Sequence, residues 1–160
     1  MQQTVTTTVR VKLHSLTDRK AALLAREYEA FQLEVHGGDA DLYSATAQQV
    51  SKVQQQKDPN PGTEQPVVLR NDVFDVCHTD DTVLSSWWVR VPVYDPEQGR
   101  GNSIWCPAHL PHKDEQLVHE GDIRDSELLR RDGDWYVHLV VDRSVTVQDE
   151  YDDVLAIDMG

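Results

Sequence analysis

The chain has 160 residues, of which 39% are hydrophobic and 27% charged, a composition typical of one soluble globular domain. Asp and Glu outnumber Lys and Arg by 28 to 15, which gives a formal net charge of −13. No apolar run approaches the roughly 18 residues that would span a bilayer. The Thr-rich residues 1–8 do not resemble a secretory signal. We therefore expect a cytoplasmic protein without a membrane partner.

The acidic excess is unevenly distributed along the chain. Residues 1–57 hold seven Lys/Arg and six Asp/Glu, whereas residues 58–160 hold eight and 22, which predicts two parts with different roles. Acid-rich, Lys-poor surfaces are typical of proteins from a salt-saturated cytoplasm, where a Debye length of about 3 Å screens repulsion. An ordinary acidic protein is the alternative. Acidity argues at first sight against nucleic acid, because phosphate binding usually shows as a basic surface.

A strand followed by two helices is predicted for the first part. Apolar and polar residues alternate over residues 4–14, which predicts a half-buried strand. Thr17 is a good N-cap for a helix whose apolar stripe reaches Val35 and which Gly37 ends. A second, Gln-rich helix is predicted from Ser44 to Lys57, although its apolar positions are few.

Period-two alternation returns after a Pro- and Gly-containing linker at residues 58–62. Asp132-Gly133 between two alternating segments is a strong hairpin signal. Trp87 and Trp135 lie on Val-rich strand faces and are predicted to be core residues. Strands are expected at residues 66–70, 73–76, 85–94, 103–106, 126–131 and 135–143, with a further apolar run at 154–158. Closely spaced antiparallel strands predict a small barrel with the helical pair inserted after the first strand.

Basic and aromatic residues on these elements could bind nucleic acid. They lie on one face of the first strand, early in the first helix, in the second helix, and on one face of strand 85–94, where an aromatic ring could stack on a base. A solvated polar face, or a strand face covered by other elements, is the alternative. The candidate nucleic-acid-binding residues are Arg10, Lys12, Arg19, Lys20, Arg26, Lys52, Lys57, Trp88 and Arg90.

Two patterns have residue types that bind metals. Asp158 follows an apolar run, a position where phosphoryl-transfer sites place a Mg²⁺ ligand. One carboxylate cannot form such a site, and strand-end acids are common turn formers. Cys106, His109 and His112 offer zinc-ligand types, but their spacing matches no usual pair of ligand pairs. A buried cysteine with exposed loop histidines is the alternative.

The segment from Tyr151 to Gly160, Tyr-Asp-Asp-Val-Leu-Ala-Ile-Asp-Met-Gly, resembles the first RuvC motif of the TnpB family, transposon-encoded OrfB-type proteins that act as RNA-guided DNA nucleases. In that family a hydrophobic strand leads to an Asp that is the first catalytic metal ligand, and Asp158 occupies this position. The segments around Asp132-Gly133 and the Trp-Tyr strand at Trp135 are similar to the region upstream of the motif. The acidic composition points to the branch found in halophilic archaea.

The resemblance implies a mainly β, α+β fold: a wedge-type small antiparallel β-barrel from residues 1–14 and 66–149, a two-helix recognition insertion at 15–65, and the first strand of a RuvC-like domain at 150–160. These parts would bind guide RNA and target DNA, with base pairing supplying sequence specificity. Mg²⁺ would bind Asp158 only in the full-length context, because the family's later acidic motifs and zinc ribbon are absent from this chain. We expect the chain alone to be catalytically inactive.

Two other functions stay open. The chain could be a decayed or standalone remnant that folds without binding nucleic acid, or one that serves as a protein-interaction module. A zinc-binding domain using Cys106 and His109 is the other. For nucleic-acid binding, the acidic surface predicts that hydrogen bonds and stacking dominate, with a weaker salt dependence than a basic binder shows.

Overall fold

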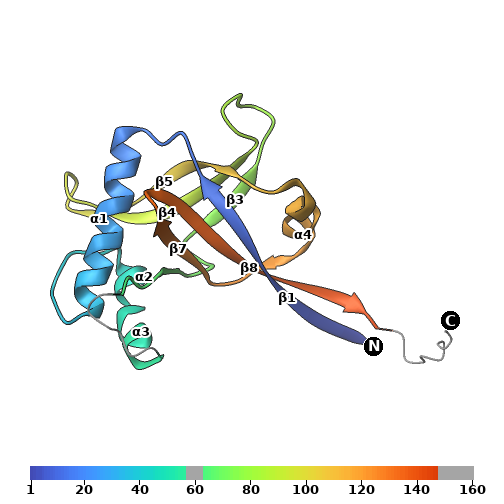
Figure 1. Cartoon of the computed structure of the whole chain (residues 1–160), viewed down its shortest axis with the longest axis horizontal. Helices are drawn as coiled ribbons and strands as arrows, with labels where there is room; N and C mark the ends of the chain where they lie inside the picture. The colour runs from blue at the N-terminus through green and yellow to red at the C-terminus, as the bar shows by residue number, and fades with distance from the viewer. Residues whose placement is uncertain (57–62, 148–160) are drawn as a thin grey trace.

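The computed structural model describes residues 1–56 and 63–147 of the chain. The strands form one antiparallel sheet in the order β2-β7-β8-β1-β5-β4-β3, and β6 pairs with β8 (Figure 1). The strands are β1 (Gln2–Leu13), β2 (Val67–Leu69), β3 (Asp75–His78), β4 (Trp87–Asp95), β5 (Arg100–His109), β6 (Asp122–Ile123), β7 (Ser126–Arg131) and β8 (Asp134–Thr146). The helices are α1 (Asp18–Val35), α2 (Ser44–Ala47), α3 (Val50–Gln56) and α4 (Glu115–Glu120), with a 3₁₀ turn η1 (His112–Asp114).

A long two-stranded ribbon of β1 and β8 forms the centre of the sheet. The strands pair from the first residue of β1 to Lys12↔Tyr136, so the strand predicted at residues 4–14 is confirmed. The other edge of β1 contacts β5 only at Lys12 and Leu13. The ribbon therefore joins two groups of strands, and its far end extends beyond α4 (Figure 1).

The mainly antiparallel α+β class is confirmed, but the sheet is open. We expected a closed barrel, and the described strands do not close one: β2 and β3 lie at opposite ends of the sheet. These end strands are short, with three residues in β2 and four in β3, so they offer few backbone groups for a further ladder. The β7–β8 hairpin predicted at Asp132-Gly133 is confirmed, and both turn residues have positive φ, as a type I′ turn requires.

One hydrophobic core lies against a single face of the sheet, which we call the inner face. Trp87 and Trp135 are 5% and 7% exposed and belong to this core, as predicted. Helix α1 covers the inner face with fully buried Leu24 and Phe31, and Tyr28 packs edge-to-face on Trp135 at 5.2 Å. The opposite side, the outer face, carries the side chains that alternate with the core residues along each strand.

The predicted ends of the first helix are confirmed. The Thr17 hydroxyl accepts a hydrogen bond from the Lys20 N–H at 3.2 Å, which caps the N-terminus. After the last residue, Val35, the chain turns through Gly37 with φ of 98°, a backbone conformation that glycine adopts without strain.

Two short helices replace the single second helix predicted from Ser44 to Lys57. Ala45 in α2 and Val53 in α3 are both buried, and the break at Gln48 and Gln49 lets each short helix turn its few apolar side chains to the core. Helices this short depend on such packing rather than on intrinsic propensity. Lys57 lies outside the described residues.

The sequence patterns did not predict η1, α4 and β6, which lie between residues 112 and 123. The strand predicted at 103–106 extends as β5 to His109, and Pro107 lies within it. Helix α4 has six residues, too few to show a helical hydrophobic period. None of the helices in the described part of the chain is long and apolar enough to cross a membrane.

A buried carboxylate, Glu27, attaches α1 to the sheet. Its Oε1 accepts the Tyr94 N–H of β4 at 2.7 Å, and its Oε2 accepts the Tyr43 N–H before α2 at 2.9 Å. The side chain is fully buried, and this burial raises the pKa of Glu27, while the two hydrogen bonds and nearby Arg26 oppose the rise. Glu27 therefore sets where α1 crosses the end of β4.

We expect Glu27→Gln to lower the free energy of unfolding by about 1–3 kcal/mol, because the amide NH₂ would face one of the two N–H donors. The raised pKa also means that the folded state binds more protons than the unfolded state above the ordinary value of 4.5. The contribution of Glu27 to stability should therefore fall as pH rises through the window from 4.5 to the raised value. Urea unfolding across pH measures both effects. The matched control is Glu34→Gln on the same helix, and an unchanged pH slope in Glu27→Gln would contradict the assignment.

Candidate nucleic-acid interface

The outer face of the sheet brings together basic and aromatic side chains from several strands. Arg10 of β1 lies opposite His138 of β8, and Lys12 lies opposite Tyr136 on one side and His109 on the other. Every second residue of β5 lies on the same face as His109, and β5 pairs with β4. Both groups of strands therefore contribute side chains to the outer face. With one lysine from α1, we call the following set the outer-face cluster: Arg10, Lys12, Lys20, Trp88, Arg90, Trp105, Tyr136 and His138.

Arg10 lies over the ring of Tyr136. Its guanidinium carbon is 4.3 Å from the ring centroid, within the range of a cation–π interaction. The pKa of neighbouring His138 is lowered mainly by burial, and also by Arg10 and Arg131, whereas Glu127 opposes the shift. A neutral imidazole beside Arg10 leaves that guanidinium free to attract an anion.

Arg90, Trp105, Lys20 and Trp88 form the second half of the cluster. Arg90 lies opposite Trp105, with its guanidinium carbon 5.8 Å from the ring centroid, and its Nε is buried without a hydrogen-bond partner. The Lys20 amine donates to the Trp105 carbonyl and lies 5.4 Å from the Trp88 ring centroid. Trp105 itself is 39% exposed, so part of this residue is accessible to a ligand.

Three of the predicted cations, one of them in the cluster, make polar contacts within the protein. Lys12 lies 3.4 Å from Asp134, an exposed ion pair of low expected strength. Arg19 is paired with the buried carboxylate of Asp95 at 2.9 Å. Arg26 donates to a loop carbonyl at 2.9 Å and lies over the Tyr94 ring. Arg19 and Arg26 therefore stabilise the junction of α1 with β4.

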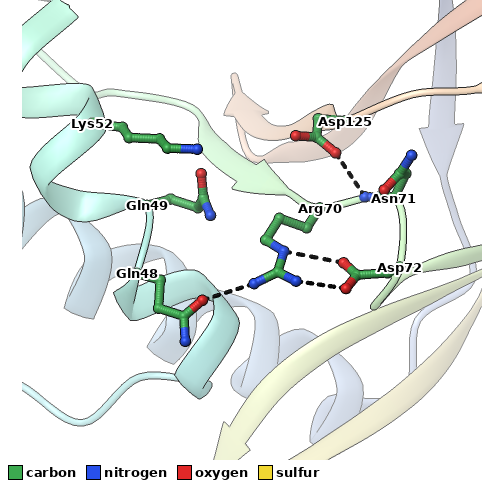
Figure 2. A pocket seen from close by; sticks show the side chains of 7 residues that line it. All are labelled: Gln48, Gln49, Lys52, Arg70, Asn71, Asp72 and Asp125. Carbon is green, nitrogen blue, oxygen red and sulfur yellow. Dashed lines mark hydrogen bonds and ion pairs between the residues drawn. The ribbon is translucent and has the colours of Figure 1, made fainter.

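Lys52 lies in a separate polar cavity of about 370 Å³ (Figure 2). Arg70 is held in this cavity by both carboxylate oxygens of Asp72, at 2.5 and 3.1 Å, and by Gln48 at 2.7 Å. The Arg70 guanidinium in turn lowers the pKa of Asp72. The Lys52 amine points into the cavity without such a contact among the residues drawn (Figure 2). The lining residues are Gln48, Gln49, Lys52, Arg70, Asn71, Asp72 and Asp125.

The candidate metal ligands do not form a site in the described residues. Cys106 is buried on the inner face, whereas His109 is exposed on the outer face and His112 follows in η1. Within residues 1–56 and 63–147, no group of three or more His, Cys, Asp or Glu side chains could hold a metal ion. The zinc interpretation of Cys106 and His109 therefore has no geometric basis here. Asp158 lies outside the described residues.

Sequence analysis did not assign Trp105 and Tyr136 to the interface. Tyr136 alternates with core residues of β8, which placed it on the outer face without naming its partner Arg10. The outward orientation of Trp105 was not predicted, because only residues 103–106 were expected to form a strand. Extending that strand to His109 and setting Cys106 inward would have placed Trp105 outward, opposite Arg90.

No family model matches the chain, and no curated protein matches it. The resemblance to the TnpB family therefore depends on the motif residues alone. Residues 151–160, which carry the RuvC-like motif, lie outside the described part of the structure.

We expect the two cysteines to differ sharply in reactivity, which tests the orientation of β5. Burial raises the pKa of Cys106 to about 12, whereas Cys77 is exposed. At about pH 8 a thiol reagent should label Cys77 at least about 100-fold faster than Cys106 in the folded chain. Mass spectrometry after timed labelling measures both rates, with Cys77→Ser as the control that removes the fast phase. Rapid labelling of Cys106 would contradict its inward orientation.

Proposed function

We propose that this chain is the N-terminal, guide-RNA- and target-DNA-binding portion of a TnpB-like, transposon-associated RNA-guided DNA endonuclease. The resemblance of residues 151–160 motivates the kinship, and the outer-face cluster supports the binding role. Helices α1–α3 lie between β1 and β2 in the chain, an order in keeping with a mainly antiparallel β-domain that carries a helical recognition insertion at residues 15–65.

One observation carries the binding proposal: Arg10 and Arg90 have no ion-pair partner among the described residues. In a chain of net charge −13, other arginines such as Arg19, Arg70 and Arg130 are paired with carboxylates. The guanidiniums of Arg10 and Arg90 also lie beside aromatic rings on the outer face, a combination that no other arginine without an ion pair shows among the described residues. Unpaired cations next to stacking surfaces suit a phosphate backbone with splayed bases.

The acidic surface shapes how binding would occur. A protein whose cations neutralise few phosphates releases few counterions from the nucleic acid, so the affinity falls only weakly as salt rises. Stacking on the exposed part of Trp105 is short-ranged and persists when salt screens charge. The cluster is therefore suited to binding nucleic acid in concentrated salt.

Catalysis would need the rest of the nuclease. Asp158 would hold Mg²⁺ together with carboxylates that this chain lacks, since two-metal phosphoryl transfer needs several acidic oxygens. The role of this chain's own residues is therefore to bind and position RNA and DNA, and the chain alone is inactive.

We expect Arg10→Gln and Arg90→Gln each to weaken binding of a fluorescein-labelled RNA–DNA heteroduplex of about 20 base pairs. A loss of about tenfold, or about 1.4 kcal/mol, is expected because each removes a cation that has no carboxylate partner among the described residues. Fluorescence anisotropy in molar KCl measures the dissociation constants, and circular dichroism confirms folding.

The matched control for these variants is Lys113→Gln, which removes one positive charge from η1, outside the cluster. It should change the dissociation constant less than about twofold, a difference of about 0.4 kcal/mol. Equal losses in all three variants would indicate a non-specific charge effect and contradict the assignment of the outer face.

We expect Trp105→Ala to weaken binding of the same heteroduplex, or of its RNA strand alone, by at least about fivefold, because stacking contributes about 1–3 kcal/mol per base. Trp105→Phe should keep most of the affinity, since it retains an aromatic face. Both variants keep the backbone carbonyl that accepts from Lys20. Equal affinities for the alanine and phenylalanine variants would contradict stacking.

A folded chain that binds no RNA or DNA at any salt concentration would favour the other function, a protein-interaction remnant. The observation that favours this second candidate is the far end of the β1–β8 ribbon, which extends beyond α4 (Figure 1). The two functions are distinguished by whether the Arg10 and Arg90 substitutions alter any binding.

A further inference from the structure

One edge of β1 is open over most of its length. The first edge pairs with β8 along the whole strand to Lys12. The second edge pairs with β5 only at Lys12 and Leu13, followed by the His14 N–H donating to the Pro107 carbonyl at 3.0 Å. From Gln2 to Arg10, no described strand pairs with this second edge.

The hydrogen-bonding pattern of β8 shows which backbone groups of β1 are unused. Val140 donates its N–H to the Ser126 hydroxyl at 3.1 Å and accepts the Arg124 N–H at 2.8 Å, so its backbone points away from β1. Thr8 lies opposite Val140, and its N–H and C=O therefore point away from β8. By alternation, the open edge carries the N–H and C=O groups of Gln2, Thr4, Thr6, Thr8 and Arg10.

The sequence explains why β5 does not cover this edge. Antiparallel continuation of the Lys12↔His109 pair would place Pro111 opposite Arg10. Proline has no N–H to donate, so the ladder ends there. The chain then turns into η1 and α4 and rejoins the sheet through β6, on the far edge of β8.

The open edge lacks the features that usually protect edge strands. Residues 1–9 contain no Asp, Glu, Lys, Arg, His or Pro, although charged side chains and proline are the common means of preventing edge pairing. Val5 is 40% exposed and Thr4 and Thr6 are exposed. On a chain of net charge −13, this edge itself carries no charged side chain from residue 1 to 9, and the nearby Asp142 carboxylate accepts from Thr6 and lies 3.5 Å from Arg124.

We infer that two copies of this chain associate through antiparallel pairing of their β1 edges. A two-fold axis at Thr6 places Thr6 opposite Thr6, Thr4 opposite Thr8, and Gln2 opposite Arg10, so all five open-edge residues find partners. No like charges face each other in this register. The ribbon extends beyond α4 (Figure 1), so the two acidic bodies stay apart. This inference does not depend on nucleic-acid binding.

Such an edge-to-edge contact is small compared with stable protein interfaces, so the dimer is weak and concentration-dependent. Sedimentation velocity of the full chain in molar KCl should show the average mass rising from monomer toward dimer with concentration. Thr6→Pro should weaken association at least about tenfold, about 1.4 kcal/mol, because it removes the central open-edge N–H. Proline is tolerated here because this N–H does not bond to β8.

The matched control is Thr6→Ala, which loses the same hydroxyl contact to Asp142 as the proline variant but keeps the N–H. It should dimerise as the unsubstituted chain does. A monomer at all concentrations would overturn the inference. Equal dimerisation of the proline and alanine variants would also overturn it.

Cross-linking tests the register independently. In a Cys77→Ser background, Thr6→Cys should form a disulfide dimer under mild oxidation, because the two copies of residue 6 face each other across the axis. Thr4→Cys, whose partner is Thr8, should cross-link at least about tenfold more slowly, since the two cysteines lie about 13 Å apart along the strands. Equal cross-linking at both positions would contradict this register.

Discussion

The backbone ladder between β1 and β8 is the constraint on which the rest of the structure depends. It runs the length of β1 and is the link that joins β7 and β2 on one side to β5, β4 and β3 on the other. Its alternation sends Val9 and Val137 to the core and Arg10 and His138 outward. The core, the outer-face cluster and the open edge of β1 are therefore three consequences of one strand pairing.

The acidic composition acts locally as well as globally. Carboxylates hold several arginines in structural positions: Asp95 holds Arg19, Asp72 holds Arg70, and Glu29 and Glu64 hold Arg130. Among the cations without a carboxylate partner in the described residues, Arg10 and Arg90 lie against aromatic rings on the outer face. In such a chain, pairing is more informative than net charge about where an anionic ligand could bind.

Sequence patterns predicted most of the regular structure because period and caps are local. The strand at residues 4–14, the helix capped by Thr17 and the hairpin at Asp132-Gly133 each follow from neighbouring residues. The open sheet and the contact of Arg90 with Trp105 depend on strand order and register, which involve residues far apart in the chain. The break in the second helix likewise depends on how Ala45 and Val53 meet the core.

The pairing of β1 with β8 also bears on how the chain acquires its fold. The ribosome makes β1 first, yet the strand that pairs along its whole length is the last strand described, and more than a hundred residues separate them. Contacts between such distant segments make folding slow, because a large loop must close before they form. During synthesis β1 therefore stays unpaired. Helix α1 likewise has no complete sheet to pack against until translation nears residue 146.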